Sequence, residues 1–318
     1  MAITRASACA KAILLGEHAV VYGRPAIAVP IPARTAVVEV HDAAPGAGIG
    51  IVAHDLNRRY QRGACPVDSD GEFMLAAVEG VLQHVCPGRS CPDLEISVRS
   101  TIPIARGLGS GAAVSAAIAR GIAAHLGISI PQDQLSELVF ATECLLHGTP
   151  SGIDNTVVCC ESAIWFRRGQ APELLPVGGP ITLVIGDTGI PSRTSESVAR
   201  VRHRREREPE AVEALLDGIG ETVAQGREAI AEGDAQTLGR AMDRDHALLQ
   251  ELGVSGTALD TLVAAAREAG ALGAKLSGGG MGGCMIALAT PQGAAHVEAA
   301  LLGAGAHDTI VSQIEPSA

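Results

Sequence analysis

The sequence contains a glycine-rich segment, Gly107-Leu108-Gly109-Ser110-Gly111-Ala112, between a run that predicts a strand and a run that predicts a helix. Such a loop presents unpaired backbone N–H groups and the positive end of a helix dipole, and both favour a bound phosphate. The spacing also fits a plain strand–helix turn or a G-x-G-x-x-A dinucleotide loop. The dinucleotide interpretation is the weaker one, because the next expected element is a helix and not a parallel strand.

A second glycine-rich segment runs from Gly278 to Gly283, after a predicted helix and before a predicted strand. This order is the reverse of a dinucleotide-binding loop. We expect a glycine turn packed beside another backbone or a ligand, with a plain hairpin as the alternative. No G-x-x-x-x-G-K-[ST] motif occurs in the chain, which excludes a P-loop nucleotidase.

Two carboxylates are candidates for work on a phosphoryl group. Asp154 lies in the glycine-flanked turn Pro150-Ser151-Gly152-Ile153-Asp154-Asn155, where an ordinary turn aspartate is the alternative. Glu143 lies on a predicted helix among apolar neighbours. A carboxylate on such a face needs a cation or a buried partner, so it is a candidate magnesium ligand, with a solvent-exposed glutamate as the alternative.

Lysine is rare in this chain, since only Lys11 and Lys275 among its 24 basic residues are lysines. Lys11 lies at the first predicted strand, and Glu17 and His18 follow it closely. In isolation, Lys11 also fits a salt-bridged surface lysine, and His18 fits a hydrogen-bonded structural histidine. The pattern assigns no role to Lys275. The arginine-rich run 200–207 is typical of a solvated helix face rather than a phosphate clamp.

Composition excludes several classes of function. The formal charge is −11 without a basic block, and aromatic residues make up 2% of the chain, so we expect no nucleic-acid partner. No uncharged apolar run reaches the roughly 18 residues of a membrane helix, so we expect no membrane partner. Charged residues interrupt the apolar N-terminal stretch, which predicts a cytoplasmic protein rather than a secreted one. The eight cysteines show neither zinc-site spacing nor a disulfide framework.

The elements that must position these residues alternate between hairpins and helix pairs, which favours an α+β fold. Periodicity predicts strands at 11–15, 35–40, 94–98, 181–185 and 284–289, and helices at 72–85, 112–126, 132–146, 195–207, 210–232 and 257–269. Residues 42–72 are expected to be irregular or to form a hairpin. A stretch rich in proline and glycine, 172–180, predicts a boundary between domains 1–177 and 178–318.

Three segments in this order resemble the superfamily of galacto-, homoserine, mevalonate and phosphomevalonate kinases (GHMP kinases): residues 10–23, 103–113 and 274–284. Within it, Gly16-Glu17-His18, the segment 147–155 and Asp187-Thr188-Gly189 are similar to mevalonate kinases. The resemblance covers essentially the whole chain. It implies an N-terminal ATP- and magnesium-binding domain like ribosomal protein S5 domain 2, a ferredoxin-like C-terminal domain, and an active site in the cleft between them.

The resemblance also implies roles for the candidate residues. The 107–112 loop would wrap the phosphates of the co-substrate ATP, and Glu143, with Ser110, would bind Mg²⁺. Asp154 would be the catalytic carboxylate near the 5-hydroxyl of mevalonate, and Lys11 would lie between that hydroxyl and the γ-phosphate. The mevalonate pocket would be lined by Glu17, His18 and Thr194. The family also suggests a homodimer.

Two positions depart from the family pattern. The family loop usually reads Gly-Leu-Gly-Ser-Ser-Ala-Ala, with the second serine as a magnesium ligand, and this chain has Gly111 there. Backbone contacts to phosphate survive the change, while one hydroxyl ligand is lost, and water or Ser110 is its expected replacement. The second departure is Arg193, which adjoins Thr194 although the family often places this arginine beside the proline.

Three other functions compete with a mevalonate 5-kinase. The first is a sister kinase of another small alcohol, including a mevalonate 3-kinase. The second is an ATP- or metabolite-binding paralogue without turnover, a reading that Gly111 motivates. The third is a dinucleotide-dependent oxidoreductase, which requires the 107–112 loop to close a β-α-β unit.

Overall fold

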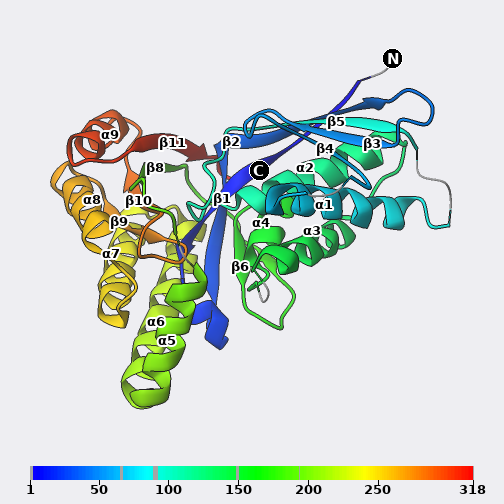
Figure 1. Cartoon of the computed structure of the whole chain (residues 1–318). Helices are drawn as coiled ribbons and strands as arrows, with labels where there is room; N and C mark the ends of the chain where they lie inside the picture. The colour runs from blue at the N-terminus through cyan, green and yellow to red at the C-terminus, as the bar shows by residue number, and fades with distance from the viewer. Residues whose placement is uncertain (1–2, 65–66, 89–91, 148–149, 193, 318) are drawn as a thin grey trace. The chain divides into compact units, whose positions relative to one another are not determined.

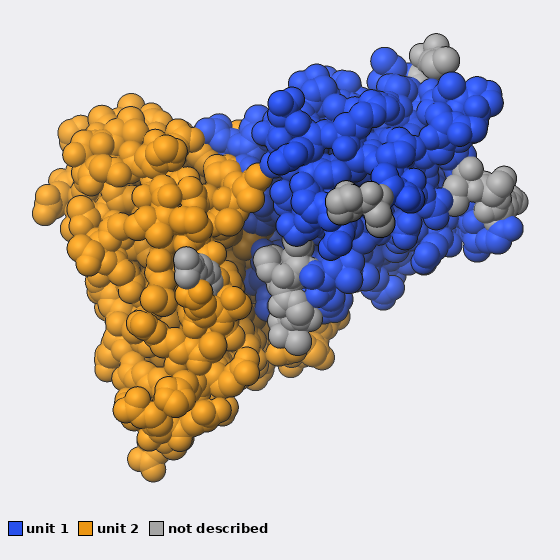
Figure 2. Space-filling view, viewed as in Figure 1, with its two compact units in different colours: residues 1–10, 34–102, 109–161 blue, residues 11–33, 103–108, 162–318 orange. Residues whose placement is uncertain are grey.

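A computed structural model of the chain describes residues 3–64, 67–88, 92–147, 150–192 and 194–317. The chain forms two compact units that interleave along the sequence (Figure 2). Unit 1 comprises residues 1–10, 34–102 and 109–161, and unit 2 comprises residues 11–33, 103–108 and 162–318. Two long strands, β1 (Thr4–Leu15) and β2 (Ala26–Asp42), supply residues to both units.

Unit 1 combines a sheet with four helices. The sheet order is β4-β3-β5-β2, in which β3 (Ile49–Ala53) runs parallel to β5 (Leu94–Ser100), and β4 (Arg58–Gln61) and β2 pair antiparallel to their neighbours. The helices gather on one side of this sheet (Figure 1): α1 (Ser69–Val85), α2 (Ser110–His125), α3 (Gln132–His147) and α4 (Ile153–Cys160). Gly121 of α2 lets that helix approach Val38 and Val40 of β2 closely.

Unit 2 contains a four-stranded antiparallel sheet in the order β11-β8-β10-β9. Its strands are β8 (Ile181–Asp187), β9 (Gly273–Ser277), β10 (Cys284–Ala289) and β11 (Asp308–Ile314). Its helices are α5 (Thr194–Arg207), α6 (Pro209–Glu232), α7 (Ala235–Leu252), α8 (Thr257–Glu268) and α9 (Ala294–Gly303). The first part of β2 pairs with β6 (Ile164–Phe166), which pairs with β7 (Glu173–Leu174), and a 3-10 turn, η1 (Ala19–Tyr22), follows β1.

Local sequence signals set several helix ends. Asp68 caps α1 by accepting a hydrogen bond from the Gly71 amide, and Asp234 caps α7 by accepting one from Thr237. Pro209 begins α6, where its missing N–H costs no intrahelical bond, and Gly233 ends that helix in the left-handed conformation. The core of unit 2 is almost entirely aliphatic, built from Val, Leu, Ile, Ala and Met. This fits the low aromatic content of the chain.

The α+β prediction is confirmed, since hairpins and helix pairs dominate and strand pairing is mostly antiparallel, with β3 and β5 as a parallel pair. Every predicted strand and helix is present, and β3 with β4 forms the expected hairpin within 42–72. Because α3 follows α2, the 107–112 loop does not close a β-α-β unit, which argues against the dinucleotide fold.

The sequence pattern does not predict the helices α4, α7 and α9, the strands β6, β7, β9 and β11, or the 3-10 turn η1. The reason is clearest in α7, where Asp245 and His246 are buried among Leu and Met residues. These two polar residues interrupt the apolar repeat on which a helix prediction depends, although Leu238, Met242, Leu249 and Leu252 keep helical spacing. Helix α4 is only 8 residues long and begins after Gly152, which has φ 91. Its glycine-flanked start is typical of a turn, so the sequence does not predict a helix there.

The two compact units differ from the predicted domains 1–177 and 178–318, because β1 and β2 pass from one unit to the other. The assignment of ATP and magnesium binding to 1–177 stays a prediction. The six described cysteines form no disulfide with one another, and Cys65 and Cys91 lie outside the described residues. Among the described helices, none combines the length and apolar character needed to cross a bilayer.

Two glycines allow α7 and β9 to touch through their backbones. A Cβ added to Gly239 of α7 would lie 2.1 Å from the Leu272 carbonyl oxygen, and one added to Gly273 would lie 2.1 Å from the Gly239 oxygen. Real Cβ atoms do not approach backbone oxygens this closely, so any side chain here forces the two elements apart. The contact sets the distance between two buried charged residues, Asp245 on α7 and Lys275 on β9.

We therefore predict that Gly239→Ala destabilises the protein by about 1–3 kcal/mol, the usual cost of overpacking a buried contact. The midpoint of guanidinium unfolding measures the effect. Gly303→Ala is the matched control, because Gly303 also lies in a helix of unit 2 and has no atom within 4 Å of its added Cβ. A Gly239→Ala midpoint equal to that of the control would contradict the close approach.

Candidate active site

The end of β1 meets the start of the glycine loop and the end of β9 within unit 2. Lys11 is buried, with 2% of its surface exposed, and its amide donates to the Leu108 carbonyl at 3.0 Å. Ser277 donates from Oγ to the Ile13 carbonyl at 3.0 Å, and a Cβ on Gly107 would lie 3.5 Å from the Ser277 carbonyl oxygen. Parts of all three sequence motifs therefore lie side by side.

Glu17 belongs to a fully buried ionic cluster. Lys275 Nζ bonds to Glu17 Oε1, lies 3.4 Å from Asp245 Oδ2, and donates to the Leu276 carbonyl at 2.7 Å. The side chains of all three charged residues are at most 1% exposed. Burial raises the pKa of Glu17 to about 8 and also raises the pKa of Asp245, while the Lys275 ammonium opposes both shifts. The ammonium is thus what keeps a carboxylate charge tolerable here.

His18 follows Glu17 in a backbone conformation that is uncommon for a non-glycine residue, with φ 61. Its ring is buried, and Nε2 lies 3.0 Å from the Gly279 carbonyl oxygen. A carbonyl only accepts, so Nε2 carries the proton and Nδ1 is left as an acceptor in the neutral ring. Burial lowers the pKa of His18 to about 4, which keeps the ring neutral near pH 7.

Thr194 lies beside the same glycine turn. It is the exposed first residue of α5, and a Cβ on Gly279 would lie 2.7 Å from its Oγ1. The turn also packs closely against the backbone of Val254, since a Cβ on Gly280 would lie 2.0 Å from the Val254 carbonyl oxygen. The segment 278–283 is therefore both a hairpin turn, joining β9 to β10, and a glycine turn packed beside another backbone. Through Gly279 it contacts both His18 and Thr194, and Glu17 adjoins His18 in the chain.

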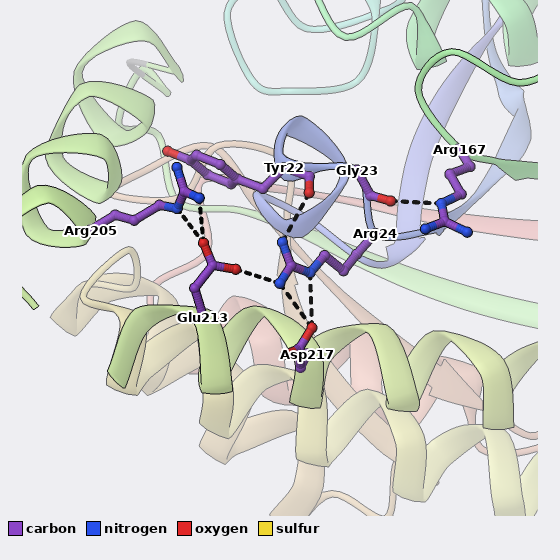
Figure 3. Close-up of polar contacts among 7 residues, drawn as sticks. All are labelled: Tyr22, Gly23, Arg24, Arg167, Arg205, Glu213 and Asp217. Carbon is purple, nitrogen blue, oxygen red and sulfur yellow. Dashed lines mark hydrogen bonds and ion pairs between the residues drawn. The ribbon is translucent and has the colours of Figure 1, made fainter. Parts of the chain in front are cut away.

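A surface network holds the turn that follows His18, as Figure 3 shows. Arg24 donates from Nη1 to the Tyr22 carbonyl at 3.0 Å and from Nε to Asp217 at 3.0 Å, and it also pairs with Glu213 of α6. Arg205 of α5 pairs with Glu213 too, and its guanidinium carbon lies 5.0 Å from the centre of the Tyr22 ring. These contacts join η1 and the residues after it to α5 and α6.

The Asp187-Thr188-Gly189 segment is joined to the residues just before the glycine loop. Arg106 donates from Nε to Asp187 Oδ2 at 2.9 Å and from Nη2 to the Gly189 carbonyl at 3.0 Å. The Gly189 amide donates to Asp187 Oδ1 at 2.8 Å. Because Asp187 is buried and accepts on both oxygens, it orders the chain around Arg106 and has a structural task.

Unit 1 contributes the other predicted residues from three helices that pack against one another, α2, α3 and α4. Gly109, at φ 71, turns the chain into α2, so that Ser110 is the first residue of that helix. Glu143 of α3 is buried, with 3% of its surface exposed, which contradicts the solvent-exposed alternative. Asp154 is half-buried in the first turn of α4. Hydroxyl and carboxylate oxygens are the donors that Mg²⁺ prefers, so Ser110 and Glu143 fit that ion.

Comparison with known proteins places the chain in a family. The GHMP kinases N terminal domain matches residues 73–162, and the GHMP kinases C terminal domain matches residues 227–307. The mevalonate kinase of Pyrococcus furiosus is 38% identical over 302 residues, covering 89% of this chain and 88% of its own. That of Thermococcus sibiricus is 37% identical over 318 residues, covering 94% and 93%. The chain belongs to the mevalonate kinase family.

Solved structures agree with this membership. The L. major mevalonate kinase in complex with R-mevalonate has a TM-score of 0.86 and 28% identity, covering 99% of this chain and 96% of its own. The Lactococcus lactis galactokinase complexed with galactose reaches a TM-score of 0.81 at 20% identity, covering 99% and 94%, which shows a shared fold alone. The predicted two-domain GHMP kinase fold is thus confirmed, while the fold by itself does not separate mevalonate kinases from other kinases of the superfamily.

The predicted site residues fall into two sets in this mevalonate kinase family member. Unit 2 brings together Lys11 with the start of the glycine loop, and Glu17 and His18 with Thr194, whereas unit 1 holds Ser110, Gly111, Ala112, Glu143 and Asp154. Their catalytic and binding roles stay predictions. Gly148, Thr149 and Arg193, which carried part of the resemblance, lie outside the described residues.

Sequence analysis missed the partners of Glu17. Lys275 had no assigned role, although the scarcity of lysine was a signal that pointed to it. Asp245 lies on α7, a helix that the sequence pattern does not predict. Its spacing was informative, since Asp245 follows Leu238 and Met242 and precedes Leu249 and Leu252 at helical intervals. A carboxylate on an apolar helix face indicates a buried partner of opposite charge.

The lowered pKa of His18 predicts an acid destabilisation. Between pH 6.5 and about 4 the unfolded chain binds a proton that the folded ring does not, so stability falls as pH falls through this window. We expect wild type to lose up to about 1.4 kcal/mol per pH unit relative to His18→Asn, which tolerates the positive φ. Guanidinium midpoints at several pH values from 7.5 to 4.5 measure this difference. The exposed His203→Asn variant is the control and should follow wild type, and parallel profiles for His18→Asn and wild type would contradict the assignment.

Proposed function

We propose that this chain is an ATP-dependent mevalonate kinase that transfers the γ-phosphoryl group of ATP to the 5-hydroxyl of (R)-mevalonate, yielding 5-phosphomevalonate and ADP for isoprenoid synthesis. The observation that carries the proposal is the similarity to mevalonate kinases, 37–38% identity over about nine-tenths of the chain. The juxtaposition of motif residues in unit 2 supports it, because the three motifs meet there although they are far apart in sequence.

The glycine loop suits the phosphates of ATP. Gly107 and Gly109 both adopt positive φ, which leaves the backbone close to a ligand, and the amides at the start of α2 have no helical partner. Backbone N–H groups bind phosphate without any side chain, so the glycine at position 111 does not weaken this contact. The loop residues from Gly107 to Ala112 are accordingly proposed as the ATP-binding segment.

Magnesium is proposed to bind at Glu143 and Ser110. When bound, the ion neutralises charge on the phosphates that react. Among the described residues no group of three or more His, Cys, Asp or Glu side chains is arranged to hold a metal. This agrees with the chemistry of Mg²⁺, which takes one or two carboxylates and completes its shell with water and substrate phosphate. The buried position of Glu143 favours a cation beside it over a free surface carboxylate.

Asp154 and Lys11 are proposed to act on the acceptor alcohol. An alcohol is too weak an acid to lose its proton to a carboxylate before attack. As the bond from the hydroxyl oxygen to γ-phosphorus forms and the bond to the ADP oxygen breaks, the hydroxyl proton becomes acidic and passes to Asp154. The Lys11 ammonium stabilises the negative charge that develops on the oxygens.

Mevalonate recognition is proposed for the turn in unit 2. Mevalonate offers a carboxylate and hydroxyl groups, and Thr194 and His18 Nδ1 are matching partners for the hydroxyls. Glu17 shapes the same pocket from its buried position. The homodimer and the cytoplasmic location expected from the sequence stay predictions.

Product analysis tests this function. Incubation of the protein with ATP, Mg²⁺ and (R)-mevalonate should give ADP and a phosphate ester whose phosphorus NMR signal couples to the C5 methylene protons. Asp154→Asn should lower kcat by about 10²–10⁴-fold, the usual contribution of a general base, while ATP binding is retained. A 3-phosphate ester would support the sister kinase instead, and tight ATP binding without ADP release would support the non-catalytic paralogue.

Because Gly111 offers no hydroxyl ligand, we predict that the protein binds magnesium weakly and that a hydroxyl at this position would raise the affinity. Gly111→Ser restores the ligand that the family usually has, so the Mg²⁺ concentration at half-maximal rate should fall roughly fivefold, which corresponds to about 1 kcal/mol for one added polar contact. Gly111→Ala is the matched control, since it fills the same space without an oxygen. Equal magnesium titrations for the two variants would exclude position 111 from the metal site.

A further inference from the structure

Lys275 is the largest fully buried side chain of the described residues, and its ammonium lies between two carboxylates. Nζ bonds to Glu17 Oε1 and lies 3.4 Å from Asp245 Oδ2, with the Leu276 carbonyl as a further acceptor at 2.7 Å. Asp245 Oδ2 is also 3.5 Å from the Gly16 amide. Three segments, the Gly16–His18 turn, α7 and β9, therefore meet at one ammonium group.

Stability alone does not account for this cluster. A buried ion pair often contributes no more than apolar residues of the same volume, because both charges lose their hydration. The cluster is also incompletely satisfied, since Glu17 Oε2 and Asp245 Oδ1 are buried and have no hydrogen-bond partner among the described residues. Its two acids and one ammonium balance in charge only when one acid is protonated, and burial, which raises the pKa of Glu17 to about 8, favours the proton on that residue. Such an arrangement costs stability, so its presence beside the proposed pocket indicates a task other than packing.

The cluster holds the Glu17–His18 turn rigidly to β9 and to the turn that follows β9. Gly16, at φ 101, has no room for a side chain, because an added Cβ would lie 2.7 Å from Ala26 Cα. At the other end, His18 bonds to the Gly279 carbonyl, and Gly279 is four residues beyond Lys275. The Glu17 carboxyl group and the His18 ring are thus both bonded to one short stretch, 275–279. Thr194 touches the same stretch through Gly279.

We propose that Lys275 is a positioning residue for acceptor-substrate binding: its ammonium fixes the Glu17 carboxylate and, through the adjoining peptide, the orientation of His18 that receives the acceptor alcohol. The proposal rests on the function proposed above, in which Glu17 and His18 line the mevalonate pocket. Lys11 and Lys275 then have different tasks, with Lys11 acting at the transferred group and Lys275 acting through Glu17.

Kinetics of Lys275→Met test the proposal, because methionine keeps most of the length and removes the charge. We expect the KM for mevalonate to rise at least tenfold, and the dissociation constant of mevalonate measured by calorimetry without nucleotide to rise equally. The KM for ATP should stay within twofold of wild type. The proposal would be overturned if activity falls only in proportion to the amount of folded protein and the KM for mevalonate is unchanged.

A double variant keeps the test decisive if Lys275→Met does not fold. Lys275→Met combined with Asp245→Asn removes one acid together with the ammonium. Glu17 is then the one acid left in the cluster, so two buried acids are not left without a cation. We expect this variant to fold and still to show the raised KM for mevalonate, whereas recovery of the wild-type KM would assign Lys275 a structural role.

Arg267→Met is the matched control. Arg267 pairs with Asp243 at 2.7 Å and donates to the Ala274 carbonyl at 2.8 Å, so it also joins α7 to β9, one residue from Lys275, without touching Glu17. It should lower stability and leave the KM for mevalonate unchanged. Failure of wild type to phosphorylate mevalonate would refute the proposed function and this inference together. Wild-type turnover with an unchanged KM in Lys275→Met would refute the inference alone.

Discussion

One ammonium group buried between two carboxylates is the constraint on which unit 2 is built. Lys275 reaches that position only because α7 and β9 touch through glycine backbones, which brings Asp245 opposite the strand. The same ammonium reaches Glu17, so the turn after β1 is tied to β9 by charge. In a low-dielectric interior, a misplaced charge is costly, and this makes the geometry of the cluster stringent. The outer network around Arg24 then holds the following turn against α5 and α6 (Figure 3).

Small residues allow this arrangement. The chain has 38 glycines and 2% aromatic residues, and several of its closest contacts join one backbone to another. The turn between β9 and β10 approaches Val254, Thr194 and Pro191 so closely that Gly279, Gly280 and Gly282 have no space for a Cβ. Backbone carbonyls and amides thereby become the groups that position side chains, as the Gly279 carbonyl does for His18. A rigid frame of this kind limits the entropy cost of ordering a small polar substrate.

The fold is shared more widely than the substrate, since a galactokinase has a TM-score of 0.81 to this chain at 20% identity. Discrimination between acceptor alcohols must therefore come from a few side chains on a common frame. The turn that carries Glu17 and His18, for which we propose a role in acceptor binding, suits that task because the buried cluster fixes its orientation. The glycine loop, which we propose binds phosphate through backbone groups, is instead suited to the part of the reaction that all these kinases have in common.

The α+β class, most helices and strands, and the family follow from the sequence alone, because these depend on local periodicity, glycine turns and ordered motifs. It also named Lys11, Glu17, His18 and Thr194, residues that the fold gathers around two motif segments. The tertiary structure alone revealed α7, the partnership of Lys275 with Glu17 and Asp245, and the packing of the glycine turn against Val254. A buried ion pair joins residues more than 200 positions apart, and no local pattern encodes such a contact. It is decided only when the core closes and every buried charge must find its partner.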